Sequence, residues 1–128
     1  MQMLQAIPAL PVKDVTLSLD FYRDKLGFTV VHQEGGLAVL VCHDVQIHLW
    51  VANDDSWKTR SNPSPVCTGA ESFIAGTVSC QIRVEGVDEL HDRMKPMGIV
   101  HPNAQLCDQP WGVRDFGVLD RQQLDYIL

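Results

Sequence analysis

The sequence lacks the features that mark several large classes of protein. It contains no run of basic residues, and its formal net charge is -6 with a pI of about 5.1. Phosphate backbones are anionic, so nucleic acid is not an expected partner. No apolar run approaches the roughly 20 residues of a membrane span, so no membrane partner is expected either. We expect a small-molecule ligand, and a cationic one would suit the acidic chain.

Cysteine is scarce and scattered. The four cysteines form no C-x-x-C pair, so a disulfide framework is possible by count only. The first residues, Met1-Gln2-Met3-Leu4, contain no basic segment and begin no long apolar run, so no signal peptide is expected. We therefore expect a cytoplasmic protein with reduced thiols.

The residues that are present predict an α+β fold. With 45% hydrophobic and 20% charged residues, the 128-residue chain suits one globular domain or two small halves that share a core. Hydrophobic periodicity predicts a helix that Asp14 caps and Gly27 ends. An edge strand containing Pro8 and Pro11 is expected before it, and an antiparallel meander after it. These strands are predicted over residues 3–12, 28–33, 37–42 and 45–52.

The same pattern returns in the second half of the chain. Val84 lies 72 residues after Val12, and Gly98, which ends a second predicted helix, lies 71 residues after Gly27. Such nearly equal offsets indicate an internal repeat. Strands of the second half are predicted over residues 78–84, 99–100, 114–119 and 124–128.

The repeat divides the sequence into two modules of the pattern βαβββ. The first module covers about 3–52 and the second about 78–128. Residues 53–77, rich in Pro, Gly, Ser and Thr, are interpreted as a linker loop.

A short aromatic motif opens a strand of the second module. Pro110 and Gly112 bracket Trp111 and fix a bend, because proline fixes its own φ and glycine permits φ > 0. Trp111 at this position either plugs a core or forms the wall of a site. In the strand that follows, Arg114 and Phe116 share a face. Arg114 is expected in a structural ion pair with Asp115 or Asp120.

Two segments resemble the vicinal oxygen chelate superfamily, which includes glyoxalase I, extradiol dioxygenases, fosfomycin-resistance enzymes and bleomycin-resistance proteins. Residues 7–28 resemble the opening of that family, a strand followed by x-D-hydrophobic and F-Y/W-x-x-x-L-G-F. Residues 109–120 resemble P-W-G-x-R-E-F-x-x-x-D-P-D-G of the bleomycin-resistance branch, with Asp115 in place of the Glu and Arg121-Gln122-Gln123 in place of the final P-D-G. The resemblance implies two βαβββ modules that form a curved mixed sheet around a concave cleft, and a homodimer.

The resemblance also implies where a metal would bind. Enzymes of this family hold a divalent cation with His and Glu side chains, one from each of four strands. These positions fall on Ile7, His48, Ser79 and Ile127, with Asp125 as an alternative to the last. Isoleucine has no lone pair and serine is a poor ligand. We therefore predict no metal cofactor, although His48 is kept as a weak candidate ligand beside the plainer interpretation of a histidine hydrogen-bonded in a pocket.

An aromatic groove is the predicted binding site. Strand alternation places Gln46, His48 and Trp50 on one face, and Trp57 lies in the linker as a lid or an interface plug. Flat aromatic side chains stack on planar heterocycles and attract cations. The predicted ligand-binding residues are Gln46, His48, Trp50, Trp57, Trp111 and Phe116. For Trp50 and Phe116, packing in the core is an equal alternative.

Two functions stay open at this point. The first is a metal-free, non-catalytic binding protein of the bleomycin-resistance type, which sequesters a planar, cationic ligand as a homodimer. The second is a glyoxalase-like lyase or a dioxygenase that depends on a divalent metal, which is favoured by analogy of fold alone. The poor set of metal ligands and the tryptophans favour the first function.

Overall fold

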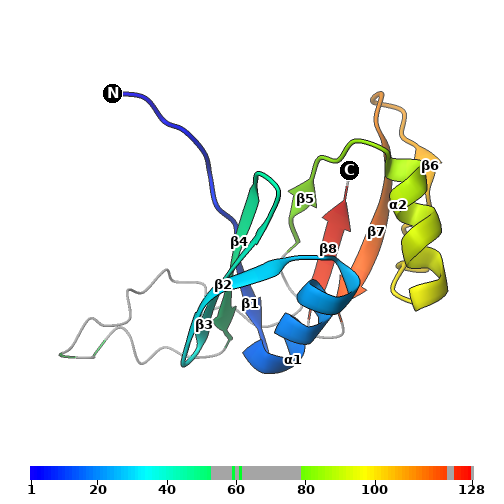
Figure 1. Ribbon diagram of the computed structural model, residues 1–128. Helices are drawn as coiled ribbons and strands as arrows, with labels where there is room; N and C mark the ends of the chain where they lie inside the picture. Colours follow the sequence, from blue (N-terminus) through cyan, green and yellow to red (C-terminus); the bar gives the residue numbers. More distant parts are fainter. Residues whose placement is uncertain (53–58, 60, 62–78, 121–122, 128) are drawn as a thin grey trace. The chain divides into compact units, whose positions relative to one another are not determined.

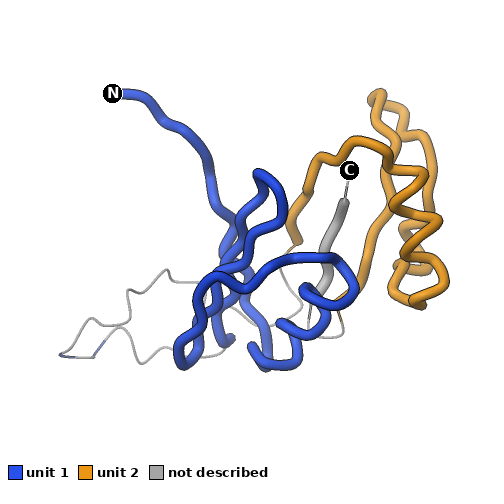
Figure 2. Tube along the Cα trace, in the orientation of Figure 1, with its two compact units in different colours: residues 1–75 blue, residues 76–128 orange. Residues whose placement is uncertain are grey.

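The computed structural model describes residues 1–52, 59, 61 and 79–120, together with the backbone of 123–127 (Figure 1). The chain has two compact units, residues 1–75 and 76–128 (Figure 2). Each unit combines helical turns with a four-stranded sheet, so the predicted mixture of helix and strand is confirmed. None of the helices in the described ranges is long and apolar enough to cross a membrane.

Unit 1 packs one helix on one sheet. Its elements are β1 (Ala9–Val12), α1 (Val15–Asp20), a π-helical turn η1 (Phe21–Lys25), β2 (Thr29–Glu34), β3 (Leu37–Cys42) and β4 (Val45–Val51). The strand order is β1-β4-β3-β2. Strand β1 runs parallel to β4, while β2, β3 and β4 form the antiparallel meander that the sequence predicts.

Local sequence signals set the two ends of the helix. The side chain of Asp14 accepts a hydrogen bond from the amide of Leu17 at 3.1 Å, as an N-cap residue does. At the other end Gly27 has a φ of +82°, which glycine adopts without steric cost. Both predicted ends are confirmed, although the last turn is π-helical rather than α-helical.

The first strand is shorter than predicted. A strand is expected over residues 3–12, but β1 begins at Ala9. Pro8 has no N–H to donate to β4, although its carbonyl accepts from the amide of His48 at 2.9 Å. Upstream of this proline, Met3 and Leu4 are exposed.

The core of unit 1 lies on the side of the sheet that α1 covers. Helix α1 packs against β3 and β4, and Ile47 and Leu49 of β4 are fully buried. Leu19 and Tyr22 are the matching buried residues of α1 and η1. Because side chains alternate along a strand, the residues between these buried positions point to the opposite side. We call the side of each sheet opposite its helix the far face.

Unit 2 repeats the strand order of unit 1. Its elements are β5 (Gln81–Ile82), α2 (Val87–Met94), a 3-10 turn η4 (Lys95–Met97), β6 (Cys107–Asp108), β7 (Arg114–Asp120) and β8 (Gln123–Ile127). The order is β5-β8-β7-β6, with β5 parallel to β8 and the other pairs antiparallel. Gly98, with a φ of +70°, follows the helical segment as predicted.

Two predicted strands of unit 2 need correction. The strand expected over 78–84 is assigned only at Gln81–Ile82 within the described residues. The strand expected at 99–100 is a single bridge between Val100 and Val118, and the edge strand is instead β6, which pairs with the start of β7. Between these two contacts the amide of His101 donates to the carbonyl of Gly117 and the amide of Gly117 donates to the carbonyl of Ala104, each at 2.8 Å. The His101–Ala104 turn therefore interrupts the strand while it stays against β7.

Helix α2 covers one side of β7. The ring of Phe116 meets the ring of His91 edge-on, with 5.1 Å between the centroids, and Phe116 and Val118 are buried. Arg114 belongs to the same side of β7, since side chains two residues apart share a face. The far face of unit 2 is therefore the side of Asp115 and Leu119.

Candidate functional site

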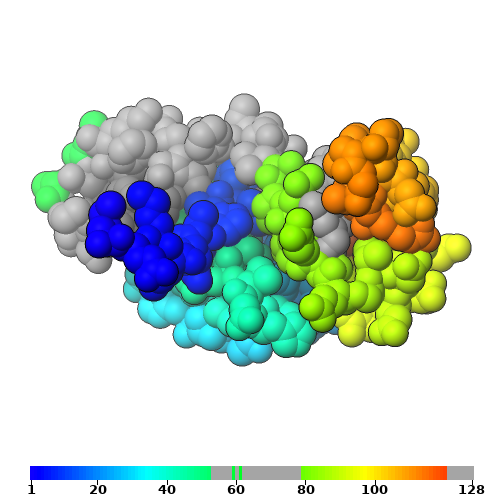
Figure 3. Space-filling view, turned by 90° about the horizontal axis from the view of Figure 1, so that it is seen from above, coloured from blue at the N-terminus to red at the C-terminus, as the bar shows by residue number. Residues whose placement is uncertain are grey.

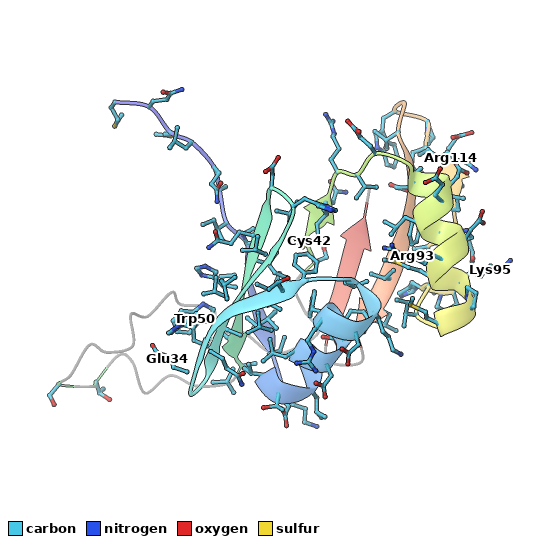
Figure 4. The ribbon with its side chains drawn as sticks, viewed as in Figure 1. Glu34, Cys42, Trp50, Arg93, Lys95 and Arg114 are labelled. Atoms are coloured by element: carbon cyan, nitrogen blue, oxygen red, sulfur yellow. The ribbon has the colours of Figure 1, made fainter. Side chains whose placement is uncertain are left out.

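The far face of unit 1 gathers three of the six predicted ligand-binding residues. Two cross-strand rows build it, Glu34–Leu37–Trp50–Pro11 and His32–Val39–His48–Ala9, each running from β2 through β3 and β4 to β1. Figure 4 shows Trp50 on the side of the sheet away from α1. Gln46 is on the same face of β4 by alternation. The prediction that Gln46, His48 and Trp50 share a face is confirmed by this register.

His48 is a neutral hydrogen-bonding group at neutral pH. Nε2 of Gln46 lies 3.0 Å from Nε2 of His48. An amide N–H donates here, so the imidazole Nε2 accepts and the ring proton sits on Nδ1. Burial lowers the pKa of His48 below its ordinary value of 6.5, because the charged form is desolvated. His48 therefore suits contacts with polar, uncharged groups of a ligand.

Trp50 is the least accessible of the three candidates on this face. Its exposed fraction is 5%, and its indole Nε1 has no hydrogen-bond partner among the residues that the structure describes. A buried donor of this kind is usually satisfied in a native protein. The indole N–H is thus a group that a ligand oxygen or a water could satisfy.

A contact between a histidine and a carboxylate on the same face escapes the sequence analysis. Nε2 of His32 lies 3.5 Å from a carboxylate oxygen of Glu34, and both side chains are half exposed. The sequence analysis missed this contact because the register of β2 shifts between Val30 and His32. Simple alternation along β2 groups Thr29 with Val31, but the bulge turns His32 and Glu34 onto the far face. Only the pairing register could have revealed this.

Trp111 lies at the tip of the hairpin that joins β6 to β7. The amide of Gly112 donates to the carbonyl of Gln109 at 3.1 Å, and the amide of Gln109 donates to the carbonyl of Val113 at 2.7 Å. With Gly112 at a φ of +92°, this is a three-residue hairpin loop with a bulge glycine. The Trp111 side chain is 71% exposed. The predicted bend is confirmed, and Trp111 is not a core plug of unit 2.

Polar contacts tie this hairpin on both of its faces. On the helix side, Nη2 of Arg114 is 2.9 Å from Oδ1 of Asp88 in α2, and Nη1 is 3.2 Å from Oδ1 of Asp108. On the far face, Nε2 of Gln109 donates to Oδ1 of Asp115 at 2.9 Å. Figure 4 shows Arg114 beside the end of α2 where that helix begins, and Figure 3 looks onto this end of the hairpin.

The prediction that Arg114 forms a structural ion pair is confirmed, but its partners differ from the predicted ones. The sequence suggested Asp115 or Asp120, yet the guanidinium binds Asp88 and Asp108. It holds the pKa of Asp88 below its ordinary value, mainly by hydrogen bonding. Asp115 points to the opposite side of β7 from Arg114, which excludes it.

The remaining predicted residues fall into different settings. Phe116 is 1% exposed and packs between β7 and α2. Of the two roles left open for it, core packing is the one that the structure shows. It does not lie on the far face of unit 2. Trp57 lies outside the described residues.

The positions carried over for a metal do not fit one. Ile7 and Ser79 are exposed residues without a suitable donor, and Nε2 of His48 is already engaged by Gln46. The position carried over to Ile127 does not correspond to that of His48. His48 pairs with Ala9 of the parallel strand β1. In unit 2 the corresponding residue of β5, Gln81, pairs with Tyr126, one residue before Ile127. Across the ranges that the structure describes, no three His, Cys, Asp or Glu side chains cluster as a metal site would require.

Sequence comparison finds a family and close relatives that match almost the whole chain. Residues 5–122 match the Glyoxalase/Bleomycin resistance protein/Dioxygenase superfamily. Bleomycin resistance proteins of Geobacillus stearothermophilus and Staphylococcus aureus (strain MRSA252) are each 65% identical over 118 residues, which is 92% of this chain and 89% of the relative.

Structural comparison finds the same fold in proteins of different activity. A bleomycin-binding protein from bleomycin-producing Streptomyces verticillus, complexed with copper(II)-bleomycin, aligns with 99% of this chain and 96% of its own, at a TM-score of 0.72 and 20% identity. A lactoylglutathione lyase from Agrobacterium tumefaciens aligns with 98% of this chain and 92% of its own, at a TM-score of 0.76 and 19% identity. At such identities the likeness establishes the fold and not the function.

Proposed function

Because this chain belongs to the Glyoxalase/Bleomycin resistance protein/Dioxygenase superfamily, we propose that it binds bleomycin-type glycopeptides and sequesters them without chemical change. The observation that carries the proposal is the 65% identity to bleomycin resistance proteins along 92% of the chain. The fold alone does not discriminate, since a lyase aligns with it as well as a bleomycin-binding protein does.

The described residues support a ligand of this chemistry. Bleomycin-type drugs are large and cationic and carry planar heterocycles, and the chain has a net charge of -6. Trp111 offers an exposed aromatic face for stacking. Gln46, His48 and Trp50 offer neutral hydrogen-bonding groups on a sheet face that also carries His32 and Glu34. Trp57 completes the proposed set of contacts, and stacking rather than metal coordination supplies the affinity.

The family resemblance extends the proposal to assembly. We propose one vicinal oxygen chelate domain whose two modules build the concave aromatic cleft, and a homodimer of such domains. Sedimentation equilibrium measures the mass in solution. A mass of one chain at micromolar protein would contradict the homodimer and leave the binding proposal in place.

Intrinsic tryptophan fluorescence tests the binding directly. The protein is titrated with bleomycin in its copper-loaded and metal-free forms, and we expect saturable quenching with a Kd below about 10 µM, near 7 kcal/mol of binding. Trp111→Ala should weaken binding at least about tenfold, as expected for an aromatic anchor. Leu17→Ala, which removes another exposed apolar side chain, is the control. Absence of quenching in the wild type would refute bleomycin as the ligand.

Elemental analysis of the purified protein tests the metal-free part of the proposal. We expect no stoichiometric divalent ion, because the four carried-over positions offer a single good ligand. One tightly held ion per chain, lost in His48→Ala, would contradict this and favour a glyoxalase-like lyase or a dioxygenase instead.

A further inference from the structure

Trp111 lies exposed in a loop of three residues. Such a loop does not by itself fix the orientation of the side chain relative to the rest of unit 2. The backbone hydrogen bonds from Gln109 and Gly112 close the loop, but they do not set the angle of the hairpin against the rest of unit 2. That angle depends on contacts between the hairpin and a neighbouring element. Helix α2 is that element on the side of Arg114.

The contact between hairpin and helix is a three-charge arrangement. Arg114 begins β7, and Asp108 lies opposite it on β6 in the register of the ladder. Nε and Nη2 of Arg114 both reach Oδ1 of Asp88, at 3.1 and 2.9 Å, while Nη1 reaches Asp108 at 3.2 Å. A planar guanidinium that uses two nitrogens on one partner fixes direction as well as distance. The base of the hairpin is thereby oriented on the first turn of α2.

We propose that Asp88, acting through Arg114, is a positioning residue for Trp111. Asp88 is the second residue of α2, and its contact spans 26 residues of sequence to reach Arg114. Its carboxylate fixes the hairpin, and the hairpin presents the indole in the orientation that stacking requires. The effect of this role on ligand affinity rests on the proposed function, whereas its effect on the order of Trp111 does not.

The chain offers a matched control in the same helical turn. Glu89 follows Asp88, is exposed and is also in the first turn of α2. Asp88→Ala and Glu89→Ala each remove one negative charge from the same helix end. Both variants therefore change the interaction with the helix dipole and the long-range attraction of a cationic ligand in the same way, so a difference between them has another cause. Only the first variant removes a partner of Arg114.

The ligand-free measurement is the order of the Trp111 indole. In protein labelled with 15N, the indole N–H signal of Trp111 is assigned with Trp111→Phe, and its heteronuclear NOE is measured. We expect a lower NOE, and so greater mobility, in Asp88→Ala than in Glu89→Ala. Asp88→Glu, which keeps a carboxylate within reach of Arg114, should restore the wild-type value. A role confined to stability would change Tm and leave this NOE unaltered.

The affinity measurement is a double-mutant cycle with copper-loaded bleomycin as the probe. Asp88→Ala should weaken binding about threefold, since exposed ion pairs contribute modestly, and Glu89→Ala less than twofold. In the Trp111→Ala background, Asp88→Ala should have no further effect.

Equal behaviour of Asp88→Ala and Glu89→Ala in both measurements would overturn the inference. An undiminished effect of Asp88→Ala in the Trp111→Ala background would overturn it as well, because Asp88 would then act on the ligand without Trp111. If wild-type protein does not bind the probe, the proposed function fails, and the NOE comparison alone decides the positioning role.

Discussion

Units 1 and 2 share one strand order but hold their candidate ligand-contacting side chains by different means. In unit 1, His48 and Trp50 project from β4, which has hydrogen-bonded neighbours on both sides. In unit 2, Trp111 projects from a loop that one exposed ion pair, between Arg114 and Asp88, connects to α2. A strand in the middle of a sheet fixes its side chains through the backbone ladder, whereas a loop depends on its side-chain contacts. A repeated backbone thus does not repeat the way in which a site is positioned.

The largest expected effect separates the two aromatic residues of unit 2. Phe116→Ala should lower the free energy of unfolding by about 3–5 kcal/mol, because it empties a space packed between β7 and α2. Trp111→Ala should change it by less than about 0.5 kcal/mol. Urea unfolding measures both. A stable Phe116→Ala protein that no longer binds ligand would place Phe116 in the site after all.

The hairpin loop should also be sensitive at its glycine. Gly112 has a φ of +92°, and a Cβ at this position would meet nothing within 4 Å. The cost of Gly112→Ala is therefore conformational, about 1–2 kcal/mol. Chemical unfolding gives this value, and a ligand titration shows whether affinity falls with it. An unchanged stability would mean that the loop can take another conformation.

The N-caps of the two helices also differ between the units, and a cap substitution should have an effect of intermediate size on stability. Asp14→Ala should lower the stability by about 1 kcal/mol, because the amide of Leu17 loses its acceptor. Lys13→Ala, one residue earlier, is the control and should have an effect within about 0.5 kcal/mol. Helix α2 begins after Gly86, which makes no side-chain cap, so unit 2 offers no equivalent site. Equal losses for the two variants would contradict a capping role.

The smallest expected effects are those of pH, and the titrating groups of the two units affect stability in different pH ranges. Burial lowers the pKa of His48 in the folded state below its ordinary 6.5, so the unfolded state binds more protons as the pH falls below that value. Stability contributed by neutral His48 is present above pH 6.5 and is lost as the pH falls through the folded pKa. The contribution of Asp88, whose pKa is also lowered, is present above its ordinary 3.8 and is lost at still lower pH.

Thermal unfolding as a function of pH tests both titrations. His48→Gln should remove the dependence below pH 6.5 and leave the more acidic one, and Asp88→Asn should do the reverse. A wild-type Tm that rises as the pH falls below 6.5 would contradict the sign derived for His48.

Local signals were sufficient to predict the parts of the fold that depend on single residues. Asp14, Gly27, Gly98 and the Pro110–Gly112 bend all act through the backbone of their own turn. The meander of unit 1 was predictable as well, because its turns are short and its strands pair with their sequence neighbours. Short-range physics decides each of these features.

Features that depend on register or on distant contacts were not predictable. The bulge in β2 reverses the face of His32 relative to simple alternation. Phe116 and Arg114 were correctly placed together, but no periodicity says which side α2 covers. The pairing of Arg114 with Asp88 joins residues 26 apart, and many aspartates nearer in sequence were available. The exposed indole of Trp111 follows from its turn, whereas its orientation does not.

The three-residue loop around Trp111 has a consequence for the entropy of binding. Proline fixes its own φ, two backbone hydrogen bonds close the loop, and the Arg114–Asp88 ion pair connects its base to α2. An indole has only two rotatable side-chain bonds. Little freedom is therefore left to lose when a ligand stacks on it. Affinity at this position should come mainly from slow dissociation of a preformed contact, because the loop does not have to fold around its ligand.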